Sequence, residues 1–204
     1  MKKKIILFGL VIFSLLILGF CFDLEIIKAI SFIRNNFLNE IFLKITMFGS
    51  AIVIFVFLTG LFLVKKKSRK MILPLWFSLG LSAFMVFLLK ISIQRIRPFQ
   101  TGVVSLLPVL EESSYFIWNF SFPSSHAMLS FCALPFLIRE FPRFKFFWIF
   151  FVVLISFSRI YFGLHFLTDV IAGAVIGYLI GGFILKKEEE NSFFEKILNK
   201  FRKN

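Results

Sequence analysis

Long apolar segments alternate with short charged runs along the whole chain. Because a helix needs about 20 mostly apolar residues to cross a bilayer, this alternation predicts membrane-spanning helices. Charges and turn residues separate six such segments, which cover residues 5–22, 45–64, 71–89, 124–138, 144–158 and 167–185. The pattern therefore predicts an all-α integral membrane protein, a six-transmembrane-helix bundle that forms a single membrane domain over residues 1–204.

Two further segments carry apolar residues at helical spacing with charges between them. The first covers residues 23–44, and the second is the tail at 186–204, where Ser192 and Glu195 form a capping-box pattern. The apolar stripe of the tail consists of Phe194, Ile197, Leu198 and Phe201. Amphipathic helices of this kind lie in the membrane interface. We therefore expect short interfacial helices at both places, with the tail on the cytoplasmic side.

Composition and charge narrow the class of protein. A hydrophobic fraction of 59% with 17% charged residues excludes a soluble globule, and 19% aromatic residues exclude a disordered chain. The net charge of +13 would indicate a nucleic-acid partner only for a soluble chain. With the N-terminus inside, 17 of the 24 Lys and Arg residues lie in cytoplasmic segments. Both termini are thus expected in the cytoplasm, with the bilayer as partner and no nucleic acid.

The polar residues at the outer ends of the predicted spans are the candidate chemistry. Lys90, Arg97 and Arg159 supply cations that suit phosphate oxygens. His165 and Asp169, four residues apart, share one helix face, so the carboxylate can orient the imidazole. Taken singly, these residues have structural explanations as membrane-edge cations, helix caps or an ion pair. Their joint placement predicts a phosphate site with a histidine placed to attack.

Three motifs in this order resemble the signature of the type-2 phosphatidic acid phosphatase superfamily, the lipid phosphate phosphatases. The motifs are Lys90 to Arg97-Pro98, Pro123-Ser124-Ser125-His126, and Ser158-Arg159 followed by His165 and Asp169. The layout is most similar to the bacterial phosphatidylglycerophosphatase-B type. One position departs from the family pattern, because Ser125 stands where the family has glycine. Serine is strained there only if the backbone needs positive φ.

The resemblance implies a role for each matching residue. His165 corresponds to the nucleophile that forms a phosphohistidine, Asp169 to its orienting carboxylate, and His126 to the general acid. The phosphate-binding positions are Lys90, Arg97, Ser124, Ser125 and Arg159. The family uses neither a metal nor another cofactor here.

These residues together predict a lipid phosphate phosphatase in a bacterial cytoplasmic membrane, with its active site facing outside. Expected substrates are phosphatidylglycerophosphate, phosphatidate or undecaprenyl diphosphate. The loop 99–122 is a candidate rim of the site, with Glu111, Glu112, Tyr115 and Trp118. Alternatives are a non-catalytic lipid-binding or transport-associated protein, a phosphotransferase, and haloperoxidase chemistry, which is expected on soluble chains. The oligomeric state does not follow from the sequence.

Overall fold

The computed structural model describes residues 2–107, 110 and 120–196. Its elements in chain order are α1 (Lys2–Phe32), α2 (Asn36–Met47), α3 (Ala51–Val64), η1 (Lys66–Met71), α4 (Ile72–Ile93), η2 (Pro98–Thr101), α6 (Ser125–Glu140), η4 (Pro142–Phe144), α7 (Lys145–Tyr161) and α8 (Leu167–Asn191). The described residues contain helices and no strand, so the predicted all-α class is confirmed for them.

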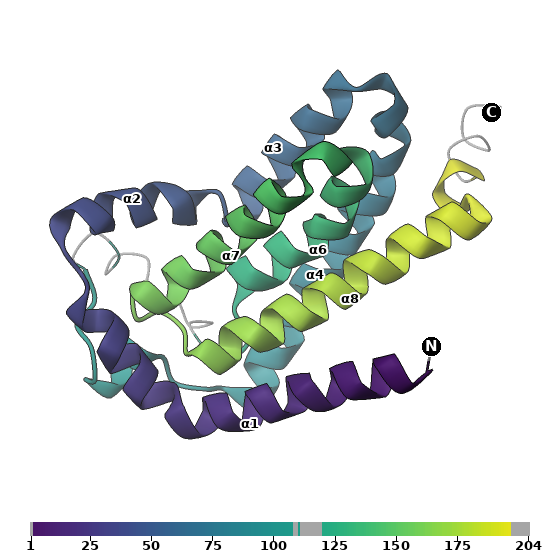
Figure 1. Ribbon diagram of the computed structural model, residues 1–204. Helices are drawn as coiled ribbons and strands as arrows, with labels where there is room; N and C mark the ends of the chain where they lie inside the picture. Colours follow the sequence, from purple (N-terminus) through teal and green to yellow (C-terminus); the bar gives the residue numbers. More distant parts are fainter. Residues whose placement is uncertain (1, 108–109, 111–119, 197–204) are drawn as a thin grey trace.

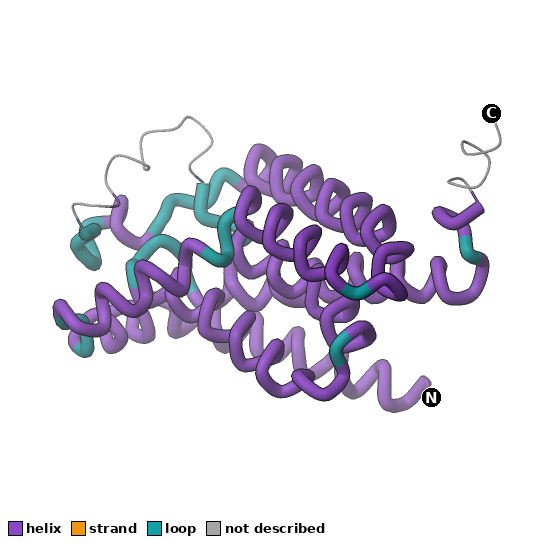
Figure 2. Tube along the Cα trace, turned by 90° about the horizontal axis from the view of Figure 1, so that it is seen from above, coloured by secondary structure: helices purple, strands orange, loops and turns teal. Residues whose placement is uncertain are grey.

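The helices form a bundle in which α6 packs against α4, α7 and α8 (Figure 1). Helix α1 runs along α8, and α2 packs on α7. The start of α1 and the end of α8 lie at the same end of the bundle in both views, while connecting segments gather at the opposite end (Figures 1 and 2). The connections that carry the three motifs are at that opposite end.

Glycines on α8 let its backbone touch that of α6. Gly173, Gly177 and Gly181 recur at every fourth residue and therefore share one helix face. A β-carbon at Gly177 or Gly181 would overlap a backbone carbonyl oxygen of α6. Small residues at this spacing allow close helix contact in membranes. This contact sets α6 and α8, which carry two of the motifs, directly beside each other.

Three described helical segments are long and apolar enough to cross a membrane. They are Lys66–Thr101, Pro142–Tyr161 and Leu167–Asn191, and they contain the predicted spans at 71–89, 144–158 and 167–185. The bent pair of α2 and α3 would make a fourth. Helix α6, with 16 residues, starts at the predicted place but is shorter than these. The six-span count and the cytoplasmic location of both termini remain predictions.

Two predicted helices are divided in the structure. The predicted span 45–64 breaks between α2 and α3, which meet at an angle of 64°, because Ser50 caps α3 by accepting from the Val53 amide at 3.4 Å. The predicted interfacial helix at 23–44 is also wrong as one element. Its first part continues α1, and Asn35 starts α2 by accepting from the Leu38 amide at 2.9 Å. Apolar spacing continues across both breaks, so periodicity alone did not reveal these side-chain caps.

The tail differs from the predicted capping box. Ser192 ends α8 with a left-handed backbone (φ 47°), and its carbonyl accepts from the Lys196 amide at 2.9 Å in the helical turn that follows. The Glu188 carboxylate accepts from the backbone amides of Phe194 (2.8 Å) and Glu195 (3.3 Å), so Glu188 caps the turn that follows. The ring of Phe194 packs on that of Phe77. Ile197, Leu198 and Phe201 of the predicted stripe lie outside the described residues.

Candidate active site

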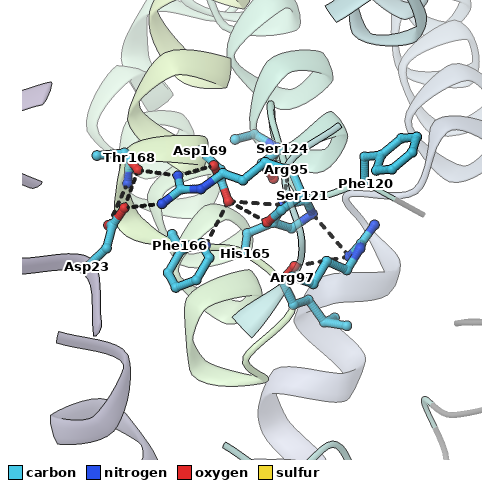
Figure 3. A network of polar contacts seen from close by, with 12 residues as sticks. Asp23, Arg95, Arg97, Phe120, Ser121, Ser124, His165, Phe166, Thr168 and Asp169 are labelled. Carbon is cyan, nitrogen blue, oxygen red and sulfur yellow. Dashed lines mark hydrogen bonds and ion pairs between the residues drawn. The ribbon is translucent and has the colours of Figure 1, made fainter. Parts of the chain in front are cut away.

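Residues from all three motifs lie close together: Arg97, Ser124, His165 and Asp169 are seen side by side in Figure 3. The last turns of α4 and α7 carry Lys90 and Arg159, and the loop between α7 and α8 carries His165. The remaining positions come from the start of η2 (Arg97), the start of α6 (Ser124, Ser125 and His126) and the first turn of α8 (Asp169). Four helices, α4, α6, α7 and α8, thus contribute to one polar site.

His165 is buried and its two ring nitrogens have different surroundings. Nδ1 lies 2.6 Å from the backbone carbonyl oxygen of Ser121. Since a carbonyl oxygen can only accept, Nδ1 carries the proton and Nε2 keeps its lone pair. Nε2 lies 3.5 Å from Nη1 of Arg97. The histidine therefore presents an unprotonated nitrogen toward the cations of the site.

The surroundings of His165 also keep its ring neutral. Burial lowers the pKa of His165 well below its ordinary value of 6.5. The positive charges of Arg97, Lys90 and Arg159 lower this pKa further, because each opposes protonation of the ring. A neutral imidazole with an unprotonated Nε2 is the form that can act as a nucleophile.

Asp169 is fully buried and reaches His165 only through another residue. One carboxylate oxygen, Oδ2, accepts from the Phe166 amide at 2.9 Å and from the Ser121 hydroxyl. The same oxygen lies 3.9 Å from Nδ1 of His165, beyond hydrogen-bond distance. The direct contact expected from the spacing of four residues is replaced by a path through Ser121. The predicted shared helix face is wrong, because His165 lies in the loop before α8 and only Asp169 is on the helix.

The three motif cations are buried and donate to neutral oxygens. Lys90 donates to the Phe120 carbonyl, and Arg97 donates to the Leu164 carbonyl at 3.1 Å. Arg159 donates to the Thr46 hydroxyl at 2.7 Å, and its buried Nε has no hydrogen-bond partner in the described part of the chain. Among the ion pairs between described residues, none involves Lys90 or Arg159. This surplus of buried positive charge suits a phosphate group.

The start of α6 supplies the second histidine. Ser124 is the N-cap, and its hydroxyl accepts from the Ala127 amide at 3.5 Å while its own amide donates to the Asp169 carbonyl at 3.0 Å. The half-buried ring of His126 lies against Gly49, since a β-carbon there would be 2.6 Å from Cδ2. The positive end of α6 thus faces the same site as the cations.

Ser125, which replaces the family glycine, has an unstrained backbone. It is the first helical residue of α6. Within the described ranges, the non-glycine residues with positive φ are Gln94 and Ser192. The position therefore does not require the backbone freedom of glycine.

Sequence reasoning missed several residues that hold the site together: Asp23, Thr46, Arg95, Ser121 and Thr168. Arg95 was visible as one of two arginines in the second half of the first motif, but its partners are distant in the sequence. The predicted interfacial helix at 23–44 includes Asp23. The described chain contains no group of three or more His, Cys, Asp or Glu side chains placed to hold a metal ion.

The predicted rim residues Glu111, Glu112, Tyr115 and Trp118 lie outside the described residues.

Comparison with known proteins identifies the family. A family model described as the PAP2 superfamily matches residues 71–192, which include all three motifs. Phosphatidylglycerophosphatase B of Bacillus subtilis is 34% identical over 190 residues, covering 86% of this chain and 84% of that protein. Undecaprenyl-diphosphatase of Sulfolobus acidocaldarius is 29% identical over 179 residues, covering 86% and 82%.

A solved structure agrees with these relatives. The crystal structure of the transmembrane PAP2-type phosphatidylglycerolphosphate phosphatase from Bacillus subtilis superposes with a TM-score of 0.69 at 27% identity, covering 89% of this chain and 96% of that one. The fold and the site define a helical membrane phosphatase. The chain belongs to the PAP2 superfamily, which confirms the resemblance found in its motifs.

Proposed function

We propose that the protein is a lipid phosphate phosphatase that works through a phosphohistidine on His165. The observation that carries this proposal is the Nδ1 contact of His165 with the Ser121 carbonyl, because it leaves Nε2 without a proton and able to attack. The cations Lys90, Arg97 and Arg159 would bind the phosphate oxygens and stabilise the charge that develops on them. Ser124 and Ser125 would add donors from the start of α6.

The reaction has two steps. In the first, Nε2 of His165 attacks phosphorus, the bond from phosphorus to the leaving oxygen breaks, and His126 gives its proton to that oxygen. In the second, His126 takes a proton from a water molecule whose oxygen attacks phosphorus. The phosphorus–nitrogen bond then breaks, inorganic phosphate leaves, and both histidines return to their starting states. Asp169 keeps the attacking ring oriented throughout.

A lipid leaving group is supported by an open apolar groove beside the start of α6. Ile52 and Phe55 of α3 and Trp76 and Leu79 of α4 line this groove. Leu129, which also lines it, lies one turn after His126 on α6. A hydrocarbon chain attached to the leaving oxygen would have apolar surroundings there.

The names of the relatives define the substrates to test first. One relative is named as a phosphatidylglycerophosphatase and another as an undecaprenyl-diphosphatase. We propose phosphatidylglycerophosphate or phosphatidate as substrate, with undecaprenyl diphosphate as the second candidate. The distribution of Lys and Arg supports an active site on the outer face of the bacterial cytoplasmic membrane.

The test is a lipid panel with purified protein in detergent, containing EDTA and no added metal, with free phosphate as the readout. Wild type should release phosphate, and the His165→Ala variant should release none above background. The Lys90→Ala variant should lose activity. Its control is Lys44→Ala, which removes an exposed cation of α2. Wild type quenched in alkaline SDS should carry labelled phosphate in a base-stable, acid-labile bond to histidine. Full phosphate release by His165→Ala would exclude the mechanism.

The outer location has its own test. The same lipid is placed in only one leaflet of sealed vesicles that contain the protein in one orientation. Phosphate should appear only when the lipid is on the face opposite the tail at 186–204, whose accessibility to protease marks the orientation. Release from the tail side would place the site in the cytoplasm.

A further inference from the structure

Asp23 is a buried carboxylate outside the region matched by the family model. It lies on α1 with 3% of its side chain exposed, whereas the match starts at residue 71. Its Oδ2 atom accepts from the Thr168 hydroxyl, and Oδ1 accepts from the Thr168 amide at 3.2 Å. Asp23 therefore caps the first turn of α8, the helix that carries Asp169.

Arg95 joins Asp23 to Asp169. Its Nη2 atom lies 2.7 Å from Oδ2 of Asp23, and its Nη1 atom lies 2.6 Å from Oδ1 of Asp169 (Figure 3). Nη1 also donates to the Thr168 hydroxyl at 2.7 Å. The guanidinium plane rests on the ring of Phe166, with its carbon 4.2 Å from the ring centroid. One arginine thus holds two buried carboxylates in a fixed geometry.

The connection continues from Arg95 to the nucleophile by two routes. Through its side chain, Arg95 binds the Asp169 carboxylate, which accepts from the Ser121 hydroxyl. Through its backbone, the Arg95 carbonyl accepts from the Ser121 amide at 2.7 Å. Ser121 then holds Nδ1 of His165 with its own carbonyl. Both routes end at the residue that orients the attacking ring.

We propose that Asp23 and Arg95 form a positioning pair that sets the orientation of His165 through Asp169 and Ser121. This inference rests on the proposed function of His165 as nucleophile. Neither residue touches the phosphate site, so the pair acts on the chemical step and not on substrate affinity. The pair also makes α1 part of the catalytic machinery.

Charge explains why both members are needed. Without Asp23, Asp169 would be the one carboxylate still paired with the Arg95 guanidinium, and the guanidinium would draw that carboxylate away from Ser121. Without Arg95, two carboxylates would remain buried at the start of α8 with no cation between them, which is strongly unfavourable. In either case the carbonyl of Ser121 and the ring it holds would move. A displacement of about 1 Å in a reacting group can lower turnover about 100-fold.

The test compares Asp23→Asn with Glu25→Gln in full-length protein. The first variant keeps the size and one acceptor of the side chain and removes its charge. The second makes the same chemical change at an exposed position of α1 two residues later. We expect kcat for lipid phosphate to fall about 10-fold to 100-fold in Asp23→Asn, with KM and the inhibition constant of inorganic phosphate unchanged. Glu25→Gln should match wild type in all three.

Arg95→Lys tests the other member and protects against a folding failure of the first variant. It keeps the charge but loses the two-pronged contact, so it should show the same loss of kcat with the same inhibition by phosphate. Because the two residues act along one path, the double variant should be no slower than the slower single variant. Thermal unfolding in detergent identifies any variant that is not folded.

The outcomes separate this inference from the proposed function. Unchanged kcat in folded Asp23→Asn would overturn the positioning pair. A fall in kcat together with a rise in the inhibition constant of phosphate would also overturn it, because that combination indicates a general loss of the site. Multiplicative effects in the double variant would also overturn it. Failure of the proposed function would instead show in wild type, which would release no phosphate, or in His165→Ala, which would remain active.

Discussion

The ring of His165 donates from Nδ1 to the backbone carbonyl of Ser121 at 2.6 Å, in a site where the nearest carboxylate oxygen is 3.9 Å away. The imidazole is therefore oriented by a neutral main-chain oxygen, and the negative charge of Asp169 acts one residue further away. This arrangement fixes the tautomer while the ring remains surrounded by cations. It also makes Ser121 the residue through which the supporting network acts.

The Ser121→Ala variant tests that role. It keeps the carbonyl that holds His165 and removes the hydroxyl that binds Asp169. We expect kcat for lipid phosphate to fall about 10-fold, and less than in Asp169→Asn, where we expect a loss of about 100-fold. Ser92→Ala is the control, since the exposed Ser92 hydroxyl bonds only within its own helix. Wild-type turnover in Ser121→Ala would show that Asp169 acts by another path.

The lowered pKa of His165 predicts the acid side of the pH profile. Protonation of Nε2 abolishes the nucleophile, so activity is lost as pH falls through this pKa. Because burial and the neighbouring cations lower the pKa, the acid limb of kcat/KM should lie below about pH 6.5, the ordinary value for histidine.

Removing one of those cations should move the limb in a known direction. Arg97→Gln eliminates the strongest charge that opposes protonation of His165, so the acid limb should shift to higher pH while kcat/KM falls at every pH. Profiles of wild type and variant, measured with one lipid between pH 4 and 9, give the comparison. A limb that stays in place or moves to lower pH would contradict the assignment of His165 as the titrating nucleophile.

Ser125→Gly restores the residue expected from the family pattern. Since Ser125 already has a helical backbone, the substitution relieves no strain. Turnover should stay within about 10-fold of wild type, which corresponds to about 1.4 kcal/mol in the barrier. Steady-state phosphate release with two different lipids measures this, and it also shows whether substrate preference changes. A much larger gain would mean that the serine impairs the native site.

Gly49→Ala tests the role of His126. The new β-carbon would lie 2.4 Å from Cγ2 of Ile155 and 2.6 Å from Cδ2 of the His126 ring, so both side chains would have to move. If His126 protonates the leaving oxygen, kcat should fall about 100-fold for a lipid phosphate and far less for an aryl phosphate, whose leaving group needs no proton. Gly60→Ala is the matched control, because a β-carbon there meets no atom within 4 Å. Equal losses for both substrates would argue against general-acid catalysis by His126.

The sequence by itself determined the class of this protein. Apolar run lengths and charge runs predicted the helices that appear as α4, α7 and α8, and three motif spacings predicted the family. These features are local, because the length of an apolar run and the offset of four between His165 and Asp169 are independent of distant parts of the chain. The same local character explains the errors. The apolar spacing continues through Asn35 and Ser50, where side-chain caps start new helices.

Only the tertiary structure decided how the site is supported. Asp23 and Thr168 are 145 residues apart in the chain, and Ser121 precedes His165 by 44. Such contacts depend on how α1, α6 and α8 pack, and no short-range pattern encodes the partner of a single buried charge. Asp23 and Arg95 each look like ordinary membrane-edge residues in the sequence. Packing places them together at the first turn of α8, where a buried carboxylate requires a cation.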